Sequence, residues 1–143
     1  MIKQIFKTIV TAILEAEARL VLKKYKPKII AVTGSVGKTS TKDAIFAVVG
    51  EALVARKSEK SFNSEIGLPL TILNCETGWS NPLLWLKNII KGFVLIITRM
   101  HYPKWLVLEL GAGKPGDIAR AVALVVPDIA VVTRFGEIPV HVE

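Results

Sequence analysis

One short segment constrains the fold of this chain more than any other: the stretch TGSVGKTS at residues 33–40, which directly follows the apolar run 29–32. An apolar strand, a glycine turn and a helix that starts with lysine and hydroxyl residues form the order typical of a phosphate-binding loop. Glycine lets backbone N–H groups approach a phosphate closely, and the helix N-terminus and the lysine supply positive charge. The segment therefore predicts an α/β fold that binds a nucleotide after its first strand.

The residue types in this segment predict separate roles. Gly34 and Gly37 would allow the backbone to approach the phosphates closely. Lys38 would reach the terminal phosphates, and the Thr39 hydroxyl would ligate a magnesium ion. The usual motif has its first glycine at the position that Val32 occupies here, so this is the shorter G-x-x-G-K-T form. The candidate nucleotide-binding residues are Thr33, Gly34, Ser35, Val36, Gly37, Lys38, Thr39 and Ser40.

Hydrophobic periodicity predicts alternating strands and helices along the rest of the chain. The expected strands are 29–33, 52–55, 105–110 and 129–133, and the expected helices are 38–49 with a stop at Gly50, 66–73, 83–98 and 116–125. This order predicts a parallel sheet with flanking helices and right-handed crossovers. We interpret residues 1–28 as an N-terminal amphipathic helix and linker, and residues 29–143 as the nucleotide-binding domain.

The most apolar segment, residues 83–98, raises the question of membrane insertion. It holds only 16 residues, among them Lys87, Asn88 and Lys91, whereas a spanning helix needs roughly 20 apolar residues. We therefore expect a helix that either packs on the protein or lies on a membrane surface.

Composition narrows the choice of partners. The net charge of +7 favours an anionic partner, but the 19 basic residues are scattered and no groove-reading motif occurs, so nucleic-acid binding is not expected. The single cysteine, Cys75, fits a reducing compartment. The sequence thus predicts a cytoplasmic protein, with contact at the inner face of the membrane as an open alternative.

Two residues outside the loop are candidates because of their positions. Glu109 ends the predicted strand 105–110, and the carboxyl ends of parallel strands border the ligand crevice of such sheets. Its carboxylate could hold magnesium, with a solvated strand-end acid as the alternative. His141 follows the last predicted strand at the same edge, where a lone histidine is more often a surface residue. Asp117 is predicted to cap a helix.

Four blocks of the sequence together resemble the central ATP-binding domain of the Mur ligases, closest to the members that add D-alanyl-D-alanine to a UDP-muramoyl peptide. The blocks are TGSVGKTSTKDA at 33–44, FNSEIGLPLTIL at 62–73, LVLELGAGKPGDI at 106–118 and PDIAVVTRFGEIPVHVE at 127–143. Four blocks in order are much more specific than a phosphate loop alone.

This resemblance implies a ligase of peptidoglycan precursor synthesis. Such an enzyme uses ATP and Mg²⁺ to convert a substrate carboxylate into an acyl phosphate, which an amine then displaces to form an amide. The implied catalytic residues are Lys38, Glu109 and His141, and the implied magnesium ligands are Thr39, Glu109 and His141. The block at 62–73 resembles the loop that lines the muramoyl-peptide cleft, so the candidate substrate contacts are Asn63, Ser64 and Glu65.

The resemblance also implies that this chain is part of a ligase. Residues 1–28 are too few to form the usual uridine-binding domain, and the C-terminal domain that brings the amino substrate would follow residue 143. We expect the isolated chain to bind nucleotide without forming the amide. A folate-tailing ligase is disfavoured, because its loop usually reads Gly-Lys-Gly-Ser. A generic P-loop protein and a non-catalytic nucleotide sensor at a membrane surface remain as alternatives.

Overall fold

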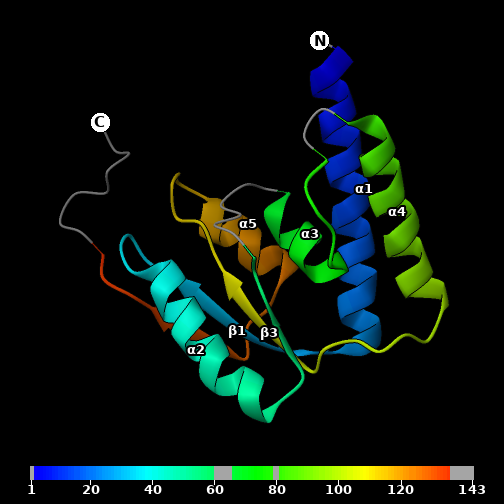
Figure 1. Ribbon diagram of the computed structural model, residues 1–143. Coiled ribbons are helices and arrows are strands. Elements are labelled where there is room, and N and C mark those ends of the chain that lie inside the picture. The colour runs from blue at the N-terminus through cyan, green and yellow to red at the C-terminus, as the bar shows by residue number, and fades with distance from the viewer. Residues whose placement is uncertain (1, 60–65, 79–80, 136–143) are drawn as a thin grey trace.

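The computed structural model describes residues 2–59, 66–78 and 81–135, which form an α/β fold (Figure 1). The helices are α1 (Ile2–Tyr25), α2 (Lys38–Ala52), α3 (Gly67–Leu73), α4 (Pro82–Ile97) and α5 (Asp117–Leu124). The strands are β1 (Lys28–Thr33), β2 (Ala55–Lys57), β3 (Trp105–Glu109) and β4 (Ile129–Val132). The predicted fold class is confirmed, including the N-terminal helix.

The four strands form one sheet in the order β2-β3-β1-β4, and every pair is parallel. The register places Ala31 beside Leu108 and Val32 beside Glu109 in the β1–β3 pair. Strands β1 and β3 are nearly continuous apolar runs because both faces of a parallel sheet are covered. The central strand β1 delivers the glycine loop to the carboxyl edge of the sheet, where β3 and its terminal Glu109 also end.

Successive side chains of the central strands point to opposite faces of the sheet, and each face is covered by its own layer of helices. One layer contains helices α1, α3 and α4, and the other contains α2 (Figure 1). The core on the three-helix side includes Ile29, Ala31, Leu106 and Leu108, together with Leu14 of α1 and Leu70 of α3. The intervening residues Ile30, Val32 and Val107 are equally buried but belong to the opposite face. This two-sided packing fixes the strands that carry the loop and Glu109.

Three predicted boundaries are wrong by a few residues. Helix α2 continues through Gly50 to Ala52, because the backbone leaves helical geometry only at Leu53. Strand β2 is consequently displaced from the predicted 52–55 to Ala55–Lys57, where it pairs with β3. Helix α5 has Gly116, not Asp117, at its N-cap; the Asp117 carboxylate instead accepts a hydrogen bond of 2.8 Å from the Lys114 N–H.

The N-terminal helix α1 is present, as predicted, and packs against α3 and α4, but it exposes the apolar residues Phe6, Ile9, Ile13 and Leu20. Its buried face is formed by Val10, Leu14, Glu17, Ala18 and Val21. Helix α4 begins at Pro82, and the Asn81 side chain caps it by accepting hydrogen bonds from the N–H groups of Leu83 and Leu84. Within the described part of the chain, no helix combines the length and apolarity that crossing a bilayer requires.

Candidate functional site

The candidate site begins at the glycine loop between β1 and α2. Gly34 has a φ of 136° and is buried, and a Cβ at this position would overlap the Thr133 hydroxyl. That hydroxyl donates a hydrogen bond of 3.0 Å to the Thr33 carbonyl. Gly34 is therefore required by both its backbone conformation and the close approach of the chain after β4. The loop is consequently held in place by the sheet edge.

The tip of the loop is closed by backbone contacts with Arg134. The N–H groups of Ser35 and Val36 donate to the Arg134 carbonyl at 3.0 and 3.4 Å. A phosphate that used these two amides would first have to displace that carbonyl. Gly37, with a φ of 84°, is the N-cap residue of α2, and no side chain among the described residues caps this helix N-terminus. The first turn of α2 thus keeps the favourable end of its helix dipole toward the loop.

Lys38, the first residue of α2, lies over the loop. Its ammonium group donates to the carbonyls of Gly34 and Ser35 at 2.8 and 3.4 Å. The positive charge is therefore placed at the loop, where the sequence predicted it to meet terminal phosphates. The side chain is only partly buried, so it can exchange these carbonyls for a phosphate oxygen.

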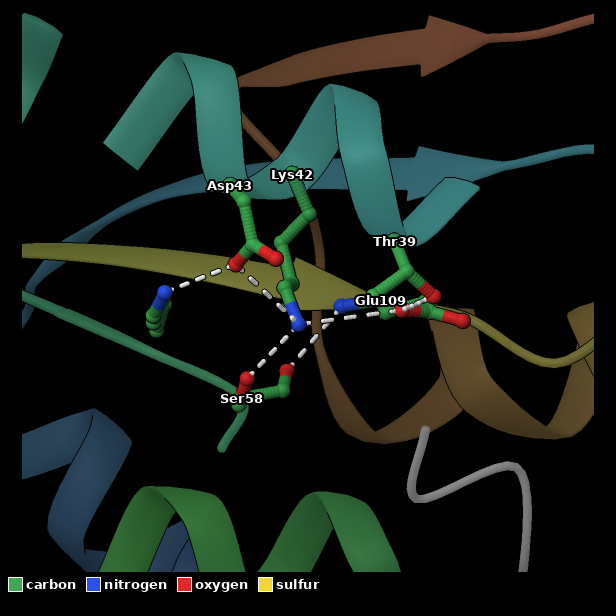
Figure 2. Close-up of polar contacts among 6 residues, drawn as sticks. Thr39, Lys42, Asp43, Ser58 and Glu109 are labelled. Carbon is green, nitrogen blue, oxygen red and sulfur yellow. Dashed lines mark hydrogen bonds and ion pairs between the residues drawn. The ribbon is translucent and has the colours of Figure 1, made fainter. Parts of the chain in front are cut away.

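Thr39 and Glu109 meet directly, although they come from different elements. The Thr39 hydroxyl donates a hydrogen bond of 2.9 Å to Glu109 Oε2. Glu109 is only 2% exposed, and its backbone N–H donates to the Ser58 hydroxyl at 3.1 Å, which fixes the end of β3 (Figure 2). The solvated strand-end acid considered from the sequence is thereby ruled out, since this carboxylate is buried beside the loop helix.

A buried lysine that sequence reasoning missed completes the cluster. Lys42 is 1% exposed, and its ammonium group donates to the Ser58 carbonyl at 2.9 Å. The same nitrogen lies 3.8 Å from Glu109 Oε2 and 3.6 Å from Asp43 Oδ1 (Figure 2). The signal was present in the spacing, because Thr39 and Lys42 are three residues apart and therefore share one face of α2. Lys42 compensates the charge that Glu109 buries.

The outer side of the cluster is a second ion pair. Lys57 Nζ lies 2.7 Å from Asp43 Oδ1, and both side chains are partly exposed. This hydrogen bond, with a smaller contribution from Lys42, holds the pKa of Asp43 below its ordinary value. From the surface inward, the charged groups are therefore Lys57, Asp43, Lys42 and Glu109. Two positive and two negative charges alternate, so the buried Glu109 is part of a charge-balanced cluster.

The oxygen atoms of Thr39 and Glu109 fit a magnesium ion. Octahedral Mg²⁺ binds oxygen at about 2.0 to 2.1 Å, which places neighbouring ligands about 2.9 Å apart. Thr39 Oγ1 and Glu109 Oε2 have that separation, 2.9 Å. No group of three or more His, Cys, Asp or Glu side chains suited to a metal occurs in residues 2–59, 66–78 and 81–135. Two protein oxygens would be sufficient, because Mg²⁺ in proteins usually takes its remaining ligands from water and from substrate phosphates.

Four of the predicted site residues lie outside the described part of the chain. His141 was predicted as a catalytic residue and magnesium ligand, and Asn63, Ser64 and Glu65 were predicted as substrate contacts. Their roles stay predictions. The structure therefore brings together Lys38, Thr39 and Glu109 from the predicted set and adds Lys42 and Ser58 to it.

The parallel sheet and its flanking helices define an α/β unit, and comparison with known proteins identifies its relatives. No family model matches the chain. The chain is 34% identical over 124 residues to the UDP-N-acetylmuramoyl-tripeptide–D-alanyl-D-alanine ligase of Bacillus subtilis, a match covering 87% of the chain and 22% of that enzyme. It is 45% identical over 97 residues to the ligase of the same name from Synechocystis, a match covering 67% of the chain and 21% of the relative.

The fold comparison agrees with the sequence comparison. The MurF ligase from Thermotoga maritima, solved in complex with ADP, matches 87% of this chain and 23% of its own length with a TM-score of 0.63 and 29% identity. The chain is thus a relative of the Mur ligases, of the type that adds D-alanyl-D-alanine, as the four sequence blocks indicated. It spans about a fifth of the length of these relatives.

Proposed function

We propose that this chain forms the ATP and magnesium site of an amide-forming ligase of peptidoglycan precursor synthesis. The observation that carries the proposal is the direct pairing of Thr39 with Glu109 beside the glycine loop, at 2.9 Å. It is supported by the relatives, which are named as ligases of UDP-N-acetylmuramoyl-tripeptide and D-alanyl-D-alanine, and by the structural neighbour that binds ADP. A carboxylate and an amine are accordingly the substrate groups that we propose, with the muramoyl tripeptide as the acid.

The residues of the site have distinct roles in this proposal. The α2 N-terminus and Lys38 bind and orient the phosphates, and Lys38 stabilises the negative charge that the transferring phosphoryl group carries. Thr39 and Glu109, whose oxygens lie 2.9 Å apart, would hold Mg²⁺, and the ion would supply charge neutralisation at the phosphates. Lys42 and Ser58 keep the Glu109 carboxylate in place. The catalytic contribution of the chain is therefore positioning and charge stabilisation.

Calorimetry of ATP binding with and without Mg²⁺ tests the proposal. Lys38→Ala should abolish most of the affinity under both conditions, whereas Glu109→Gln should remove mainly the part that depends on Mg²⁺. Thr41→Ala is the matched control, since Thr41 lies on the same helix two residues after Thr39 and therefore about 200° around the helix axis from it. A folded wild-type chain that does not bind ATP, or a Glu109→Gln variant that keeps the full Mg²⁺ dependence, would contradict the proposed site.

Ligation by the isolated chain is a separate question. We propose that it binds the nucleotide without completing the amide bond, because the chain corresponds to about a fifth of the ligases it matches. Incubation with ATP, Mg²⁺, UDP-N-acetylmuramoyl-tripeptide and D-alanyl-D-alanine should give no amide product by mass spectrometry. Detection of the product would show that 143 residues are sufficient and would refute this part of the proposal.

A further inference from the structure

Helices α1 and α4 lie side by side (Figure 1). Both expose large apolar side chains that nothing in the described structure covers. These side chains form what we call the α1–α4 face. They are Phe6, Ile9, Ile13 and Leu20 of α1 and Leu83, Leu86, Ile90, Phe93 and Ile97 of α4. The spacings are three and four residues on α4 and three, four and seven residues on α1, so the side chains of each helix form a stripe. Leu83 is 74% exposed and Phe93 is 56% exposed, so more than half of each residue's surface is accessible to solvent.

The two stripes point to the same side of the molecule. Lys24, near the end of α1, donates to the carbonyls of Leu95 and Ile96 near the end of α4, so the helices run in the same direction. Glu17 and Gly92 mark where they face each other, because the Glu17 carboxylate lies against the Gly92 Cα. At about 100° per residue, the α1 stripe is centred about 50° from Glu17 around the helix axis, and the α4 stripe is centred about 140° from Gly92 in the opposite sense of rotation. Because the two parallel helices face each other through Glu17 and Gly92, the two stripes point in directions that differ by only about 10°.

The charges beside the α1–α4 face are predominantly positive. Helix α4 carries Lys87 and Lys91 and has no acidic residue, and the last turn of α1 carries Lys23 and Lys24. Lys24 and Lys91 donate hydrogen bonds to backbone carbonyls of the chain, so Lys23 and Lys87 are the lysines that would meet a headgroup. The two acids of α1 do not oppose them, because Glu17 is buried and Glu15 is partly buried about 150° away from the stripe. An apolar stripe bordered by lysines is the pattern of a helix that lies in the interface of an anionic membrane.

We propose that the α1–α4 face binds the surface of a membrane that contains anionic lipids, with the apolar side chains in the acyl boundary and the lysines at the headgroups. A lipid surface explains the lysines better than a protein partner does, because lysine is depleted from the cores of protein interfaces, whereas beside lipid its long stem lets the ammonium group reach the headgroups. The chain's net charge of +7 also favours binding to an anionic lipid surface.

Cosedimentation of the 143-residue chain with vesicles tests this proposal. The vesicles are phosphatidylcholine alone, and phosphatidylcholine mixed with phosphatidylglycerol. We expect binding to the anionic vesicles, a marked loss as salt is raised, and weak binding to the neutral ones. The double variant Ile90→Ser/Phe93→Ser should bind the anionic vesicles about tenfold less or weaker still, since two large apolar side chains no longer leave water. Lys87→Glu should weaken binding several-fold.

A matched control distinguishes binding through the α1–α4 face from nonspecific binding of exposed apolar residues to vesicles. Val48 on α2 is as exposed as Leu83, at 74%, but lies on the opposite layer, so Val48→Ser should leave vesicle binding unchanged. Circular dichroism melting verifies that each variant is folded. Absence of binding to anionic vesicles by the folded chain would overturn the proposal. So would equal losses for Val48→Ser and the double variant, or a concentration-dependent dimer that the double variant abolishes while vesicle binding persists.

Discussion

The Thr39 hydroxyl donates a 2.9 Å hydrogen bond to Glu109 Oε2 across 70 positions of the chain. Each of the two residues is delivered by a different strand: Thr39 follows the loop that leaves β1, and Glu109 ends the neighbouring strand β3. Because β1 and β3 are parallel neighbours, their carboxyl ends bring the two oxygens to one place. The topology of the sheet thus brings the two oxygens of the proposed magnesium site together without any motif that contains both residues.

Two substitutions of Thr39 should distinguish the contribution of its hydroxyl group to Mg²⁺-dependent ATP binding from the contribution of its side-chain shape. Thr39→Val keeps the branched shape and removes the oxygen, so we expect Mg²⁺-dependent ATP affinity to fall about tenfold or more, equivalent to about 1.4 kcal/mol. Thr39→Ser keeps the hydroxyl and should retain most of the affinity. Titration calorimetry with and without Mg²⁺ measures the difference. Equal affinities for the valine and serine variants would show that the hydroxyl does not ligate the metal.

Removal of the Lys42 charge should destabilise the protein strongly. In Lys42→Met the buried Glu109 loses its neighbouring cation and the Ser58 carbonyl loses a donor, so we expect a loss of about 3 kcal/mol or more in the free energy of unfolding. Lys57→Met is the matched control. Its ion pair with Asp43 is partly exposed and should contribute only about 0 to 1 kcal/mol. Urea denaturation of both variants measures the comparison.

A double-mutant cycle tests the assignment of this loss to the lysine–carboxylate pair. If Lys42 and Glu109 are coupled, Lys42→Met combined with Glu109→Gln should lose less stability than the sum of the single variants, by about 0.5 to 3 kcal/mol. Additive losses would mean that Lys42 stabilises the fold only through the Ser58 carbonyl.

The sequence was informative wherever a local pattern determines the result. The order of elements, the glycine loop and the placement of Glu109 at a strand end followed from periodicity and from the general rule for parallel sheets. The role of Lys42 could not be read in the same way, because its partners are a backbone carbonyl of Ser58 and a carboxylate 67 residues away, and a lysine on a helix is usually solvated. The end of α2 was missed because Gly50 is tolerated inside a packed helix.

The two glycines Gly34 and Gly50 should respond oppositely to alanine. At Gly34 a Cβ would overlap Thr133 and the φ of 136° is unsuited to alanine, so Gly34→Ala should cost about 1 to 3 kcal/mol. At Gly50 the backbone is helical and a Cβ would be 3.5 Å from the Phe46 ring. Gly50→Ala should therefore stabilise the protein by up to about 1 kcal/mol. Thermal or urea unfolding gives both values. An unchanged free energy of unfolding for Gly34→Ala would mean that the loop can move away from Thr133, which follows β4.

Glu17 should make the packing of α1 against α4 depend on pH. Glu17 is 8% exposed, its Oε2 has no hydrogen-bond partner within the described residues, and burial raises its pKa from 4.5 to about 7. Between these two values the folded protein keeps a proton that the unfolded chain has released. The stability therefore decreases as pH rises through this window, and the full cost, about 3 kcal/mol, is present above pH 7.

Glu17→Gln removes the titrating group at nearly constant shape. The variant should be more stable than the wild type by up to about 3 kcal/mol at about pH 8, and the advantage should disappear below pH 4.5. Urea denaturation across this range measures it. Glu15→Gln, on the same helix but less buried, should leave the wild-type profile unchanged. If the difference between wild type and Glu17→Gln were the same at every pH, the Glu17 carboxyl would not be the titrating group, and the buried α1–α4 contact would tolerate its charge.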